Sequence, residues 1–220
     1  KALPFVDKVV FSLEKESIPY WNKFMQGYYD TSGISSDSFD QSVELNSQGQ
    51  FALTDEMQDK GISLSSAVAT SLYYLGFNMR DPVVGGLGER ARLLRRAISI
   101  AVDYDEFISI FRNGRGVPAQ GPIPPGIFGY EAGEAGHNPY IYQWHNEQLK
   151  RHSIEHAKAL MTQAGYAQGI DQETGKPLIL YFDTVSRGAD TKALLNWMVK
   201  QFAKIDIQLV IRGTDGNRCL

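Results

Sequence analysis

Hydrophobic and polar residues follow two different periods along the first third of the chain. Residues 6–13 alternate between apolar and polar side chains and are predicted as a strand, whereas residues 18–25 place apolar side chains at helical spacing. Gly27 follows that helix, and glycine is common just past a helix end. Residues 31–66 are rich in Ser, Asp, Gln and Gly and are predicted as mainly surface loop, with one or two helical turns at 53–58.

The middle of the chain predicts one strand and two helices. Residues 68–77 are aromatic and β-branched, which favours a well-buried strand. Residues 89–102 place Leu, Ile and Ala on one face and arginines largely elsewhere, which is the pattern of an amphipathic helix. Asp103 then begins a second helix at 107–112, because an aspartate before the first turn accepts hydrogen bonds from free backbone N–H groups. Asn113, followed by glycine, ends it.

The last part of the chain alternates strands and helices after a proline-rich loop. Residues 116–126 contain four prolines, which exclude a regular helix and predict an extended, semi-rigid path. Residues 153–164 and 190–204 are predicted as helices, and residues 177–182 and 205–211 as strands. The order strand, helix, strand is typical of a βαβ unit. The sequence therefore predicts an α/β fold, a mixed sheet with helices packed on it.

Composition excludes several classes of protein. The chain has 220 residues, 43% apolar and 21% charged, and a formal net charge of -3, which are the proportions of a globular protein. Residues 1–75 carry a net charge of -5 and residues 76–220 of +2, which indicates two different segments. Without a Lys/Arg block, nucleic acid is not an expected partner. Cys219 is the single cysteine, so an internal disulfide is excluded. The longest apolar run, 178–182, is far shorter than the roughly 20 residues of a membrane span.

One short motif has the spacing of a metal site. His152, Glu155 and His156 form the pattern H-x-x-E-H, in which two histidines bind zinc and the glutamate activates water. Ser153 is the best helix N-cap nearby, which would place His152 before the helix and its side chain off the face of His156. A polar helix start on the surface is the favoured interpretation. A zinc-dependent hydrolase using these three residues is the alternative function.

Two further groups of residues are candidates for chemistry. Asp103, Asp105 and Glu106 are three carboxylates in four residues, which a glycosidase or a hard-cation site could use, but helix capping explains them more simply. Aromatic residues also gather beside Gly, Pro and Asn positions, as in clefts that hold peptides and other small ligands, although core packing is the alternative for each ring. These aromatic residues are Tyr73, Tyr74, Phe77, Phe128, Tyr130, Tyr140, Tyr142 and Trp144.

Five segments occur in an order that resembles the extracytoplasmic solute-binding proteins of ABC transporters, the oligopeptide- and dipeptide-binding class called family 5. They are YYLGFN at 73–78, LRRAISIAVD at 94–103, GPIPPG at 121–126, AKALMTQAGY at 157–166 and QFAKIDIQLV at 201–210. The resemblance implies a two-lobed, periplasmic-binding-protein-like fold that closes on its ligand by hinge motion. It also implies that the chain corresponds to part of a longer protein.

In this alignment residues 1–75 are a late piece of the first lobe with the crossover strand, and residues 76–220 are the first part of the second lobe. The resemblance implies a peptide or peptide-like solute as ligand, the membrane permease of an ABC importer as partner, a periplasmic or extracytoplasmic location, and neither enzyme activity nor a cofactor. Self-association through an apolar face that the other lobe would cover is a further expectation. The ligand-binding residues that it implies are Tyr74, Phe77, Asn78, Pro122, Pro124 and Pro125.

Overall fold

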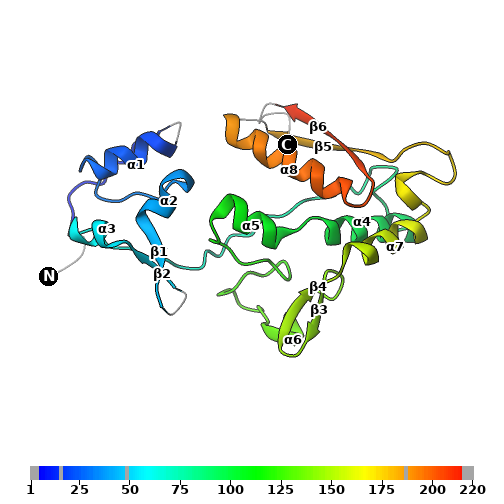
Figure 1. Ribbon diagram of the computed structural model, residues 1–220, viewed down its shortest axis with the longest axis horizontal. Helices are drawn as coiled ribbons and strands as arrows, with labels where there is room; N and C mark the ends of the chain where they lie inside the picture. Colours follow the sequence, from blue (N-terminus) through cyan, green and yellow to red (C-terminus); the bar gives the residue numbers. More distant parts are fainter. Residues whose placement is uncertain (1–4, 15–16, 48–49, 186–187, 215–220) are drawn as a thin grey trace. The chain divides into compact units, whose positions relative to one another are not determined.

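The computed structural model describes residues 5–14, 17–47, 50–185 and 188–214. The chain divides into two compact units, a first unit of Lys1–Ala67 and a second unit of Val68–Leu220 (Figure 1). Cys219 lies outside the described residues. The assignment of the two parts of the chain to two lobes stays a prediction.

The first unit packs short helices against a small hairpin. Its elements are α1 (Ser17–Met25), α2 (Ser36–Ser42), β1 (Val43–Leu45), β2 (Phe51–Leu53) and α3 (Asp55–Asp59), with β1 and β2 antiparallel. Trp21, Phe39 and Met57 form its core with Val43 and Leu53. The predicted helix at 18–25 and the helical turns at 53–58 are confirmed. The prediction of mainly surface loop at 31–66 is wrong, because that stretch also supplies α2 and both strands of the hairpin.

The strand predicted at residues 6–13 is not formed. This segment has no regular secondary structure, and its apolar side chains are open to solvent, with Phe11 92% and Leu13 96% exposed. Alternation shows which side chains would share a face, but a strand also needs a neighbouring strand for its backbone hydrogen bonds. No strand in the described part of the chain pairs with this segment.

The second unit contains most of the regular structure. The elements in chain order are α4 (Glu89–Ala101), α5 (Tyr104–Arg112), α6 (Gly133–Gly136), β3 (Tyr142–His145), β4 (Gln148–Arg151), α7 (Ile154–Gln163), the 3-10 turn η1 (Ala167–Gly169), β5 (Ile179–Val185), α8 (Gly188–Ala203) and β6 (Gln208–Thr214). Strands β3 and β4 form an antiparallel hairpin. All the helices predicted in this part of the sequence are confirmed, with small shifts of their ends.

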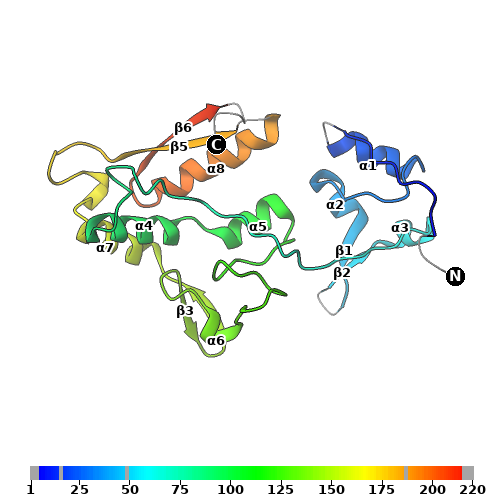
Figure 2. The same ribbon diagram turned by 180° about the vertical axis from the view of Figure 1, so that it is seen from behind.

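The βαβ unit predicted at the end of the chain is present as β5, α8 and β6. The two strands are parallel, and Leu180 pairs with Leu209 in the register that turns both side chains into the core. Helix α8 packs on this sheet, and α4 and α7 lie side by side (Figures 1 and 2). The α/β class is confirmed, and the described strands form three two-stranded sheets, one parallel and two antiparallel.

Helix α4 is the centre of the core of the second unit. Leu94, Ala97 and Ile98 are fully enclosed on its apolar face, and the buried side chains of Ala157 and Met161 on α7 belong to the same cluster. Burying such side chains is the main source of folding free energy. The opposite face of α4, which carries the arginines, is thereby held rigidly toward the surface. Among the helices described, none is long and apolar enough to cross a membrane.

Candidate functional site

Residues 68–78 form an extended segment at the start of the second unit (Figure 2). The prediction of a well-buried strand here is wrong: Tyr73 is 85% and Tyr74 80% exposed, and no hydrogen bond between two backbone groups of the described chain involves residues 68–77. An aromatic composition favours a strand, but none of the described strands pairs with the segment. Its tyrosine rings are therefore open to a ligand.

The segment is anchored through alternate side chains. Leu75 and Phe77 are partly buried against the core of the second unit, while Tyr74 and Asn78 are exposed. The side-chain hydroxyl of Tyr104, at the start of α5, also forms a hydrogen bond with the backbone of Leu75. Burial raises the pKa of the Tyr104 hydroxyl, and the Leu75 hydrogen bond offsets part of that rise. The anchoring turns one side of the segment inward and leaves the other side, with Tyr74, outside.

The proline-rich loop lies beside the beginning of this segment. The Thr70 methyl group would be 3.9 Å from a Cβ atom placed on Gly126, which fixes the two stretches as neighbours. Pro122 is exposed, and Pro124 and Pro125 are half-buried. The loop ends in a turn in which the N–H of residue 127 donates to the Pro124 carbonyl at 3.3 Å. The absence of helix and strand predicted from its prolines is confirmed.

The structure thus places the six predicted ligand-binding residues on two adjoining stretches, without testing whether they bind a ligand. Asn78 has a local structural role, since its side-chain oxygen accepts a hydrogen bond from the Arg80 N–H at 3.0 Å. Phe77 is oriented inward and lines a hollow beside α4. Of the set, Tyr74 presents the largest free apolar surface. Its role in ligand binding stays a prediction.

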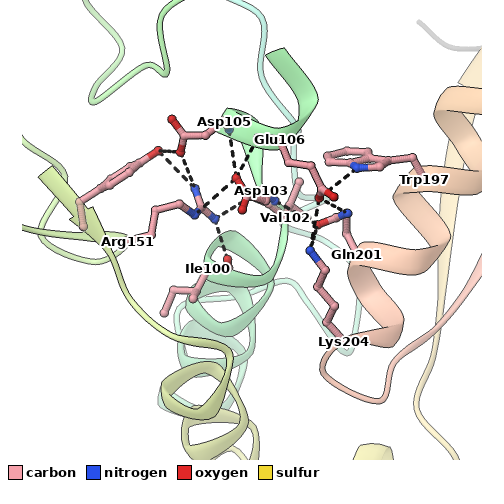
Figure 3. Close-up of polar contacts among 10 residues, drawn as sticks. Ile100, Val102, Asp103, Asp105, Glu106, Arg151, Trp197, Gln201 and Lys204 are labelled. Carbon is pink, nitrogen blue, oxygen red and sulfur yellow. Dashed lines mark hydrogen bonds and ion pairs between the residues drawn. The ribbon is translucent and has the colours of Figure 1, made fainter. Parts of the chain in front are cut away.

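The acidic cluster at the start of α5 is used within the fold (Figure 3). Asp103 caps α5 by accepting hydrogen bonds from the N–H groups of Asp105 and Glu106, both at 3.1 Å, as the capping interpretation expected. The Glu106 carboxylate accepts hydrogen bonds from the α8 side chains Gln201 at 2.9 Å and Trp197 at 3.2 Å. Glu106 therefore joins α5 to α8, while Asp103 serves as the cap of α5.

Glu106 should make the stability of the second unit depend on pH. Burial raises the pKa of Glu106, but the Gln201 hydrogen bond, the Lys204 charge and further hydrogen bonds outweigh it and lower the pKa overall. A lowered pKa stabilises the fold above the unfolded-state value of about 4.3, and this contribution is lost as the pH falls through the folded-state value. Urea unfolding across this acidic range should show a shallower pH dependence for Glu106→Gln. Identical profiles for the two proteins would contradict the assignment.

Arg151, at the end of β4, is the second centre of the polar network in Figure 3. Its guanidinium donates to the carbonyl oxygens of Ile100 at 2.7 Å and Val102 at 3.0 Å, at the C-terminal end of α4. It also donates to the Tyr142 hydroxyl at 3.2 Å. The ion-pair partners of Arg151 are Asp103 at 3.7 Å and Asp105 at 3.8 Å. A cation here satisfies carbonyl groups that a helix end leaves unpaired.

Sequence reasoning missed both Arg151 and the hairpin that carries it. The turn residues Asn146 and Glu147 have φ values of 47° and 60°, in the left-handed region of a type I′ turn. The usual sequence for such a turn is Asn-Gly, so the Asn-Glu pair is only a weak indication of a hairpin. The alternation of the aromatic residues Tyr142 and Trp144 with polar residues is a second indication.

The H-x-x-E-H motif does not form a metal site. The rings of His152 and His156 stack with centroids 4.6 Å apart, so the expectation that His152 lies off the face of His156 is wrong. His152 Nε2 donates to the Pro139 carbonyl at 3.2 Å, since a carbonyl only accepts, and its Nδ1 accepts from the Gln143 amide at 3.1 Å. Ser153 caps α7, as predicted, by accepting from the His156 N–H. In the described ranges no group of three His, Cys, Asp or Glu side chains could hold a metal ion.

The arrangement found here is an exposed aromatic segment on an α/β unit. The model of the family "Bacterial extracellular solute-binding proteins, family 5 Middle" matches the chain over residues 1–219. The chain belongs to this family of solute-binding proteins. No curated protein matches it.

Similar solved structures are much longer than the chain. The ABC transporter-associated periplasmic binding protein DppA from Helicobacter pylori, in complex with peptide STSA, is 22% identical with a TM-score of 0.46, and the match covers 64% of this chain and 22% of that chain. The oligopeptide-binding protein AppA from Bacillus subtilis, in complex with a nonapeptide, is 18% identical with a TM-score of 0.46, over 66% of this chain and 26% of that chain. For AgaA from A. tumefaciens R10, in complex with agropinic acid, the identity is 28%, the TM-score 0.42, and the coverage 56% and 21%. The chain thus spans about a fifth to a quarter of their length.

Proposed function

We propose that the chain forms part of the substrate-binding component of an ABC importer, which binds oligopeptides or peptide-like solutes in a cleft between two lobes and delivers them to a membrane permease. The match to family 5 over residues 1–219 carries this proposal. Residues 1–75 then belong to the first lobe and residues 76–220 to the second. The protein works in the periplasm or outside the cytoplasm and is not an enzyme. Self-association of the chain stays a prediction.

The extended segment at 68–78 supports a peptide as the class of ligand. Residues 68–77 make no hydrogen bond to another backbone group in the described part of the chain, and an extended peptide can pair with such a segment as an added strand. Main-chain pairing of this kind tolerates varied side chains, which suits an importer of many peptides. The exposed ring of Tyr74 adds apolar contact area beside that backbone.

Replacing Tyr74 by alanine should weaken peptide binding about tenfold, because a lost aromatic contact costs about 1.4 kcal/mol. The measurement is native mass spectrometry of the protein with a pool of short peptides, comparing bound fractions between the variant and the original chain. Tyr181→Ala is the matched control, since Tyr181 is an exposed tyrosine on β5 and not on the extended segment. It should leave the bound fractions unchanged.

Two results would count against the proposal. Absence of any bound peptide in the original chain would contradict the class of ligand. Equal losses in the Tyr74 and Tyr181 variants would contradict the place of binding, because the effect would then follow from removing any exposed ring.

A further inference from the structure

A shallow hollow of about 210 Å³ lies on the arginine-bearing side of α4, wholly within the second unit. Its walls combine hydrogen-bond donors with apolar surface and include no carboxylate. The lining residues are Phe77, Arg92, Arg95, Arg96, Ser99, Asn138, Tyr140 and Ile141. Three cationic side chains without an acidic one in the same wall make this a positively charged site.

Two of the three arginines have structural partners. Arg95 donates to the carbonyl oxygens of Val84 at 2.6 Å and Gly86 at 3.0 Å, which ties the loop before α4 to the helix. Arg92 makes a bidentate pair with Glu89, with both N···O distances at 2.8 Å. The charge of Arg92 is therefore already balanced, and Arg95 is fixed by main-chain groups.

Arg96 differs from both. Its guanidinium lies over the Tyr140 ring, 4.5 Å from the centroid. Its Nε atom is buried and has no hydrogen-bond partner in the described part of the chain, and none of the ion pairs found there involves Arg96, although its charge helps to lower the pKa of Glu89. A stacked guanidinium is held in one orientation, so its planar set of donors is arranged for an acceptor before one arrives.

The neighbours of Arg96 add hydrogen-bond donors. The Asn138 side-chain oxygen accepts from the Tyr140 N–H at 3.0 Å, which leaves the Asn138 amide nitrogen as a donor in the wall. Ser99 supplies a hydroxyl one turn along the helix. Near the hollow, burial and then the charges of His152 and Arg96 lower the pKa of His156, so a further cation is disfavoured there.

We propose that this hollow binds the carboxylate group of a small solute, with Arg96 as the charged anchor and Phe77 and Ile141 in contact with an apolar part of the same molecule. A planar guanidinium matches the two oxygens of a carboxylate. The apolar walls distinguish such a ligand from a bare inorganic anion. The site needs no residue of the first unit, so it goes beyond the binding of a peptide between two lobes.

The test is an NMR titration of the full chain with sodium benzoate, followed through the backbone amide signals of Ser99 and Asn138. We expect saturable shifts of these signals, and a dissociation constant at least tenfold higher for acetate, which lacks the apolar part. Arg96→Gln should raise the benzoate dissociation constant at least tenfold, and Arg96→Lys, which keeps the charge but not the planar donors, by a smaller factor. The spectra themselves show that each variant is folded.

Arg112→Gln is the matched control, because it removes the same charge from an exposed position at the end of α5. It should bind benzoate as the original chain does. Benzoate binding that is unchanged in Arg96→Gln, or no binding in the original chain, would overturn the proposal. Equally tight binding of inorganic phosphate would overturn the assignment to a carboxylate with an apolar part. Since no peptide is used, a failure here leaves the peptide experiment standing.

Discussion

Replacing Arg151 by methionine should lower the free energy of unfolding by about 3 kcal/mol, because it removes charged hydrogen bonds from partly buried groups. The side chain of Arg151 is only 16% exposed, and methionine fills much of its volume without donating. The carbonyl oxygens of Ile100 and Val102 would lose their donor, and the carboxylates beside them their counter-charge. Urea unfolding followed by circular dichroism measures the difference.

Arg212→Met is the control for this prediction. Arg212 also has an acidic partner, Asp183 at 2.7 Å, and also lies over a tyrosine ring, but both members of the ion pair are more than half exposed. An exposed ion pair contributes at most about 1 kcal/mol, so this variant should stay close to the original chain. If the two variants lose the same stability, Arg151 is an ordinary surface residue and the network in Figure 3 does not hold α4, α5 and the hairpin together.

The helices of the second unit could be predicted because their end signals are local. Asp103 accepts hydrogen bonds from residues two and three positions ahead, and Ser153 accepts from the N–H of His156. A cap therefore needs only a few consecutive residues to be recognised. The apolar face of α4 is equally local, since helical spacing alone brings Leu94, Ala97 and Ile98 together.

The strands could not be predicted with the same success because pairing is not local. Residues 6–13 and 68–77 have strand-like composition, but neither has a neighbouring strand among the described residues, and most of their apolar side chains remain at the surface. The prediction of β5 was correct because its partner strand β6 and the connecting helix α8 follow it in the sequence. Composition thus identified possible strands, and the partner decided which of them formed.

The candidate sites show the same limit. The resemblance placed Tyr74 and Phe77 in one short segment and Pro122–Pro125 in another, and the adjacency of the two stretches rests on a contact between Thr70 and Gly126. The hollow beside α4 joins Phe77, Arg96 and Tyr140, which are distant in the sequence and share no motif. An arginine on a helix face is usually solvated, so only the stacking of Arg96 on the Tyr140 ring and its lack of a close ion-pair partner among the described residues mark it as a binding group.

Replacing Gly169 by alanine should lower the free energy of unfolding by about 3 kcal/mol or more, from two separate causes. Gly169 has φ = 70°, and a non-glycine residue in this left-handed region costs about 1–2 kcal/mol. A Cβ atom there would also lie 1.9 Å from the Asp206 carbonyl oxygen, so the backbone near β6 would have to shift. The Gly169 carbonyl also accepts a hydrogen bond from the Leu178 N–H at 2.7 Å. A shift of the backbone at Gly169 would therefore strain this bond.

Gly175→Ala separates these two causes, because Gly175 has nearly the same φ, 66°, but no atom within 4 Å of the added Cβ. It should lose only the conformational part, about 1–2 kcal/mol. Urea unfolding of the two variants under the same conditions gives the contribution of the close approach as their difference. Equal losses would mean that the chain around Asp206 relaxes freely, and that the join between η1 and the end of α8 is not a rigid part of the fold that positions β5 and β6.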